Sequence, residues 1–220
     1  MKIAIRGGHN FQAKGAKALI DETTEDRKVR DYTIKYLKSL GHNVIDVTPG
    51  NCDTNTDLKF GVNKANKEGV DLFLSIHFNK AYDSYNGAIG TECWTIGPNK
   101  ATTIAEKITN NIASLGFKNR GVKHSKGLYE LKNTNMPAII IEVCFVEATK
   151  DVELYSKVGS EEIGKKIAEA VGGKKIDPAN IIYRVKLDGV QIGAFSKEDN
   201  VIKEIKNSWG KFNKIEIERK

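Results

Sequence analysis

The chain has 220 residues, of which 40% are hydrophobic and 29% charged, and its formal net charge is +7 at pH 7. This composition is ordinary for a soluble globular protein, and no stretch approaches the roughly 20 apolar residues of a membrane-spanning helix. The excess of basic residues is spread along the chain without an aromatic-interleaved basic stripe, so we expect neither membrane insertion nor binding to nucleic acid.

The first ten residues, MKIAIRGGHN, do not read as a secretory signal peptide, because their apolar run is short and ends at glycines. We therefore expect synthesis in the cytoplasm. The three cysteines, Cys52, Cys93 and Cys144, are far apart and form no CxxC pair. This spacing predicts reduced thiols rather than a disulfide framework or a metal cluster.

Short apolar or alternating runs predict five strands in the first part of the chain. They cover residues 2–6, 42–48, 70–76, 90–96 and 137–145. Helically spaced apolar residues, followed by glycine, predict helices between and after them. These cover residues 24–40, 57–68, 100–115 and 160–171. The alternation predicts an α/β fold with a mainly parallel, twisted sheet and helices on both faces.

Residues 117–136 are polar and rich in Gly, Asn and Lys, which predicts a long irregular segment before the most hydrophobic strand. We assign residues 1–174 to one main domain and residues 175–180 to a linker. Residues 181–220 then form a small α+β (βαβ-like) module, with strands at its two ends and a helix between them. About 40 residues are marginal for an independent domain, so this module either docks or dimerises.

Two predicted strands lead into histidines, His9 after the first strand and His77 after the third. Carboxyl ends of parallel strands meet at one edge of a sheet, where ligands bind. Two histidines, one carboxylate and an open fourth position form a common catalytic zinc site. The segment after the first strand offers the candidate carboxylates Asp21, Glu22 and Glu25.

Glu142 lies inside the apolar run AIIIEVCF of the fifth predicted strand. An ionised carboxylate is costly to bury without a partner, so this position favours a paired or a functional glutamate. Glu22 and Glu25 have a simpler alternative role, because acidic residues stabilise the amino-terminal end of a helix through its dipole.

Four sequence features now stand in order: GGH, a Glu before the first helix, SIHFN, and LYELKNTNMPAIIIEVCF. Together they resemble the zinc-dependent N-acetylmuramoyl-L-alanine amidases of the amidase-3 type over residues 1–172. The resemblance implies Zn²⁺ held by His9, Glu22 and His77, with Glu142 as the catalytic residue. It also implies a substrate contact at Asn79 of the SIHFN motif.

Within this resemblance, the family spacing to Gly41 favours Glu22 over Glu25 as the metal ligand. The first motif is RGGHN where the family commonly has PGHGG, and the last is EVCF where it commonly has E-T/S-G-F. Neither departure removes a ligand, but both alter the loops around the site.

The implied function is hydrolysis of the amide between N-acetylmuramic acid and L-alanine of peptidoglycan by zinc-activated water. The alternative is a non-catalytic cell-wall-binding protein of the same fold. Small size, an added module and no recognisable signal peptide resemble an endolysin of a clostridial phage or its host, which reaches the wall after holin-type release.

The segment YRVKLDGVQIGAFS (183–196) resembles half of a SPOR-type peptidoglycan-binding repeat pair. A half-unit could complete its sheet with a second copy, which predicts a homodimer through this cell-wall-binding or dimerisation module. A purely stabilising appendage is the alternative.

Overall fold

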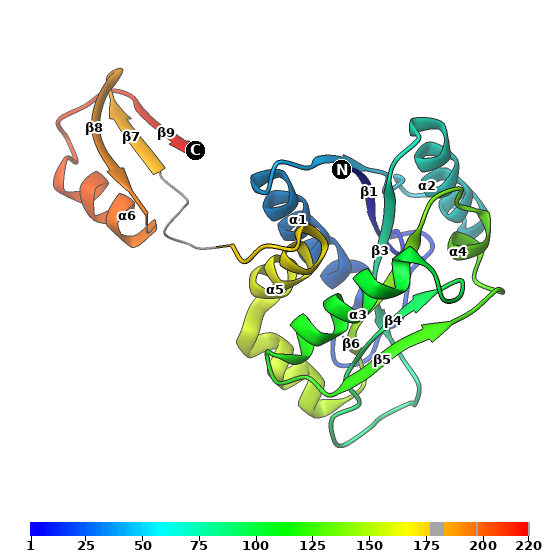
Figure 1. Cartoon of the computed structure of the whole chain (residues 1–220). Helices are drawn as coiled ribbons and strands as arrows, with labels where there is room; N and C mark the ends of the chain where they lie inside the picture. Colours follow the sequence, from blue (N-terminus) through cyan, green and yellow to red (C-terminus); the bar gives the residue numbers. More distant parts are fainter. Residues whose placement is uncertain (177–182, 197, 220) are drawn as a thin grey trace. The chain divides into compact units, whose positions relative to one another are not determined.

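Two compact units make up the chain, Met1–Lys174 and Lys175–Lys220. The computed structural model describes residues 1–176, 183–196 and 198–219 (Figure 1). Residues 177–180 of the predicted linker, and the first two residues of the predicted strand 181–187, lie outside the described residues. Among the helices of the described residues, none combines the length and the apolar character that crossing a membrane requires.

The first unit is built on a sheet of six strands in the order β2-β1-β3-β6-β4-β5. The strands are β1 (Lys2–Gly7), β2 (Asn43–Asp46), β3 (Leu72–Asn79), β4 (Thr91–Thr95), β5 (Asn119–His124) and β6 (Ala138–Phe145). Strands β2, β1, β3 and β6 are parallel, β4 is antiparallel to β6, and β5 is parallel to β4. The predicted mainly parallel sheet is confirmed, with a reversed pair at one edge.

The reversal of β4 follows from its connection. Parallel neighbours need a long crossover, usually through a helix. Residues 80–90 join β3 to β4 without a helix, so β4 enters the sheet antiparallel to β6.

The helices α1 to α5 flank this sheet on its two faces (Figure 1). They are α1 (Glu22–Ser39), α2 (Thr54–Glu68), α3 (Lys100–Ala113), α4 (Tyr129–Asn133) and α5 (Thr149–Gly172). Phe78 of β3 packs edge-on against Tyr155 of α5, whereas Phe73 packs with Leu131 of α4. Successive strand residues point to opposite faces. His77, four residues after Phe73, therefore faces the layer of α2 and α4.

Two parts of the sequence differ from expectation. Residues 117–136 are not irregular throughout, because they contain β5 and α4. β5 lies at the sheet edge and carries exposed polar residues, so it lacks a hydrophobic pattern. α5 begins at Thr149 and is kinked at Gly159, whose φ is 81°. The predicted helix 160–171 is only its second part.

The second unit contains a three-stranded antiparallel sheet in the order β8-β7-β9. Its elements are β7 (Tyr183–Leu187), β8 (Val190–Phe195), α6 (Glu198–Asn207) and β9 (Ile215–Arg219). β8 and β9 are both antiparallel to β7, so they run in the same direction and α6 links them. This is the βαβ-like module expected from the sequence. Val185 of β7 and Val201 of α6 are buried apolar residues of this unit.

Candidate metal centre and active site

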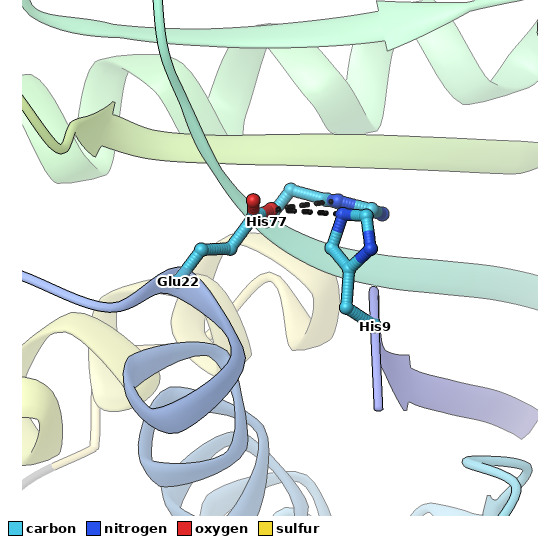
Figure 2. Close-up of side chains that lie close together, drawn as sticks. All are labelled: His9, Glu22 and His77. Carbon is cyan, nitrogen blue, oxygen red and sulfur yellow. Dashed lines mark hydrogen bonds and ion pairs between the residues drawn. The ribbon is translucent and has the colours of Figure 1, made fainter. Parts of the chain in front are cut away.

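Three side chains from different elements converge at one edge of the sheet (Figure 2). His9 follows β1, Glu22 is the first residue of α1, and His77 lies within β3. Oε1 of Glu22 is 3.4 Å from Nε2 of His9 and 3.0 Å from Nδ1 of His77. The three candidate ligand atoms all lie within 4.8 Å of one another. Two imidazoles and one carboxylate are a donor set that suits zinc.

Glu22 owes its position to the start of α1. The side chain of Asp21 caps the helix by accepting a hydrogen bond from the backbone N–H of Thr24 at 3.3 Å. The helix therefore begins at Glu22 and not at the predicted Thr24. Glu22 is buried and accepts backbone N–H bonds from Ala16 at 2.6 Å and Phe78 at 3.1 Å. These bonds fix both carboxylate oxygens.

The charge state of Glu22 suits a metal ligand. Burial raises the pKa of this carboxyl, but its hydrogen bonds and ion pairs with His77 and His9 outweigh that effect and hold the pKa far below its usual range. Glu22 is therefore ionised. Its rival Glu25 instead accepts a hydrogen bond from the Tyr155 hydroxyl at 2.8 Å, so the structure brings Glu22 to the imidazoles and Glu25 away from them.

Two glycines make room for this cluster. A Cβ atom on Gly8 would overlap the ring of His77, and a Cβ atom on Gly15 would overlap the carboxylate of Glu22 and the ring of His9. The backbone at Gly8 and Gly15 thus lies against the three donor side chains and forms a tight cradle around them. An ionised carboxylate, two imidazoles and this cradle fit a zinc ion.

The second nitrogen of His77 faces protein groups. Its Nε2 lies 3.0 Å from Oγ of Ser75 and 3.7 Å from Oε2 of Glu130. Burial lowers the pKa of His77, but Glu130 and Glu22 raise it well above its usual value. A carboxylate on the far nitrogen of a metal-ligating histidine fixes the ring and strengthens its basicity. Sequence reasoning gave Glu130 no role, although this residue lies in the motif LYELKNTNMPAIIIEVCF.

Arg6 connects this carboxylate to the loop that carries His9. It is fully buried, with Nη1 3.1 Å from Oε1 of Glu130 and a second ion pair to Asp57. It also donates to the carbonyl oxygens of Gly7 at 2.9 Å and Gly8 at 2.8 Å. The sequence analysis did not assign Arg6 a role. A charged residue at the end of the apolar strand KIAIR was the signal that could have identified it.

Glu142 lies beside the metal cluster on β6. Its Cα pairs with that of His77 on β3 and with that of Glu92 on β4. Its Oε2 is buried and accepts no hydrogen bond from any described residue. Burial raises the pKa of Glu142 to about 8, helped by the negative charges of Glu22 and Glu92 and opposed by His77. A carboxyl with a pKa near neutrality can accept and donate a proton.

Asn79 does not join the metal cluster. Its Nδ2 donates to Oε1 of Glu92 at 3.2 Å. Cys52, Cys93 and Cys144 are all free thiols. Burial raises the pKa of Cys144 well above its usual value, so this thiol stays protonated and is a poor nucleophile.

A pocket of about 310 Å³ is formed by two loops and the start of α5. It is lined by Ala18, Leu19, residues 83–86, Glu147 and Thr149. The rings of Tyr82 and Tyr85 stack at 5.5 Å on the second of these loops. Exposed aromatic rings beside a pocket are suited to contacts with a ligand.

Comparison with known proteins identifies related sequences and structures over the first unit of the chain. A family model described as N-acetylmuramoyl-L-alanine amidase matches residues 3–172. An uncharacterized protein of Clostridium perfringens is 58% identical over 179 residues, which cover 80% of this chain and 53% of that protein. The N-acetylmuramoyl-L-alanine amidase LytC of Bacillus subtilis is 35% identical over 175 residues, which cover 77% of this chain and 34% of that protein.

Among solved structures, the catalytic domain of the CD27L endolysin, described as targeting Clostridia difficile, matches with a TM-score of 0.72 and 27% identity. The match covers 80% of this chain and 99% of that domain. This chain spans about half the length of the two Clostridium perfringens relatives that it matches.

Proposed function

Since this chain belongs to the N-acetylmuramoyl-L-alanine amidase family, we propose that it hydrolyses the amide between N-acetylmuramic acid and L-alanine in bacterial peptidoglycan. The membership confirms the resemblance that the sequence motifs carry. The observation that supports the activity best is the convergence of His9, Glu22 and His77 directly beside Glu142.

We propose that His9, Glu22 and His77 hold one zinc ion. When bound, zinc supplies a Lewis acid that lowers the pKa of water and polarises a carbonyl. The ionised Glu22 would offset the positive charge of the metal, and Glu130 would orient His77 through Nε2. The cradle at Gly8 and Gly15 keeps the donors close together.

Glu142 is the proton carrier in this proposal. Glu142 would be held more in its ionised form by a cation among the three ligands, which would lower its raised pKa. Glu142 then accepts a proton from the water that adds to the lactyl carbonyl carbon. It returns that proton to the nitrogen of L-alanine as the C–N bond breaks. The products are a muramic acid carboxylate and a free amino group.

Digestion of purified cell walls tests the proposal. We expect new amino groups on alanine without new reducing ends. New reducing ends would instead indicate a glycosidase, which relies on paired carboxylates. Neither product would indicate the second candidate, a wall-binding protein without activity.

Two variants separate metal binding from proton transfer. Glu142→Gln should retain zinc and lose hydrolysis, whereas His9→Ala should lose both. Near-normal turnover by Glu142→Gln would refute the assigned role of this residue. Metal analysis of untagged protein, followed by chelation and return of zinc, tests the metal itself.

A further inference from the structure

A buried carboxylate on β4 organises a second cluster next to the proposed active site. Glu92 is 1% exposed, and its Cα lies directly opposite that of Glu142 in the antiparallel β4–β6 pair. Oε2 of Glu92 forms two ion pairs, and Oε1 accepts two hydrogen bonds, at distances of 2.6–3.2 Å. The four partners come from three strands and are Arg120, Lys123, Asn79 and Trp94.

The two cations of this cluster are held firmly yet keep unused donors. Arg120 gives Nε to Glu92 at 2.6 Å and lies over the ring of Phe145, with its Cζ 5.1 Å from the ring centroid. Its two terminal amino groups donate no hydrogen bond within the described residues. Lys123 lies 2.7 Å from the same carboxylate and 5.4 Å from the centroid of the Trp94 ring. The side chains of both cations are about one-third exposed.

The net charge of this cluster favours binding of an anion. Two cations share one carboxylate, so the cluster carries a net charge of +1. The planar fork of an arginine suits a carboxylate, which it can bind through two parallel hydrogen bonds. Because Glu92, Arg120 and Lys123 are anchored by one another, little side-chain freedom is lost when a ligand binds.

We propose that Arg120 and Lys123 bind a carboxylate of the substrate on the peptide side of the scissile amide. The proposal rests on the proposed function, and it names the part of the substrate that the site recognises. β5 lies two strands from β6, or roughly 10 Å from Glu142 at about 4.8 Å per strand. An extended peptide covers that distance in two to three residues.

A group near the start of the stem peptide fits this spacing. The second residue of that peptide is a glutamate that is linked through its side chain and therefore leaves an α-carboxylate free. That group lies within reach when the L-alanine amide is at Glu142. The cluster would thus distinguish a free α-carboxylate from the corresponding carboxamide.

The test compares two synthetic muramoyl peptides that differ only in this group, carboxylate or carboxamide. Their dissociation constants are measured by calorimetry on the zinc-loaded, full-length Glu142→Gln variant, which should bind without cleaving. We expect the carboxylate peptide to bind about tenfold more tightly, since charged hydrogen bonds are strong but these cations are partly exposed. Adding Arg120→Gln should reduce the preference to about one, whereas the exposed control Lys107→Gln should preserve it.

Equal affinities in the Glu142→Gln background, no binding of either peptide, or a preference that survives both Arg120→Gln and Lys123→Gln would each overturn the proposal. The first comparison requires no change at the cluster, so the proposal is testable even if Arg120→Gln fails to fold. Failure of the proposed function has a separate signature. In that case the wild-type chain would leave both peptides uncut, while the carboxylate preference in binding would persist.

Discussion

Replacing Glu130 with glutamine should weaken zinc binding without removing any ligand. Oε2 of Glu130 is 3.7 Å from Nε2 of His77. At an effective dielectric constant of about 20, the attraction at that distance is ~4.5 kcal/mol for a protonated His77, and it is weaker for the neutral imidazole that ligates zinc. The net effect is smaller, because Arg6 lies 3.1 Å from the other carboxylate oxygen and glutamine still accepts a hydrogen bond. Loss of such a partner typically costs about 10–100-fold in metal affinity, or about 1.4–2.7 kcal/mol.

The fold should survive this change. Arg6 keeps its ion pair with Asp57 and its bonds to the Gly7 and Gly8 carbonyl oxygens, so no buried charge is left alone. We expect a loss of about 1–2 kcal/mol in the free energy of unfolding, or a fall of about 2–8 °C in Tm.

Competition with a fluorescent chelator at several pH values measures the zinc dissociation constant of Glu130→Gln. Glu106→Gln on the exposed face of α3 is the matched control, because it removes the same charge far from any buried contact. Equal zinc affinities for the two variants would refute the idea that Glu130 acts through His77.

Other expected outcomes concern the ligands, the proton carrier and the second unit. Glu142→Gln should retain zinc and lose at least about 100-fold in wall hydrolysis, measured by released amino groups. Gly8→Ala should lose zinc by metal analysis, because the new methyl group overlaps the His77 ring. Zinc affinity should fall by up to about tenfold for each pH unit that the pH is lowered, because the raised pKa of His77 means that zinc must displace a proton from it. Calorimetry in two buffers of different ionisation enthalpy measures the number of protons released. The homodimer stays a prediction: sedimentation should show it, and Val190→Asp, at a side chain 67% exposed, should weaken it.

Most strands of the six-stranded sheet could be predicted from the sequence, because the central strands are nearly continuous apolar runs. Glu142 could be singled out for the same reason, because it is the charged residue of the otherwise apolar run AIIIEVCF. His9 and His77 were visible through their place at the ends of such strands. The structure brings these residues together at the predicted edge.

The parts that sequence reasoning missed depend on partners far away in the chain. Glu130 and Arg120 lie in a polar segment whose composition is that of a loop, and only pairing with Arg6 and Glu92 gives them a role. β5 escaped prediction because an edge strand with one exposed face needs few apolar residues. The reversed direction of β4 was not predicted, although the sequence offers no helix between residues 76 and 90 that could bring the chain back for a parallel strand.

His77 and Glu142 occupy matched positions on adjacent parallel strands, whereas the pocket beside Leu19 and Tyr85 is made of loops. The spacing between the two reactive residues is therefore set by the hydrogen-bonded ladder of the sheet and is insulated from changes in loop sequence. Chimaeras that exchange residues 80–90 between relatives should keep the proposed hydrolysis and change which cell walls are cut. The fold thus places the proposed ligand His77 and proton carrier Glu142 on the sheet, and the pocket beside Leu19 and Tyr85 on loops.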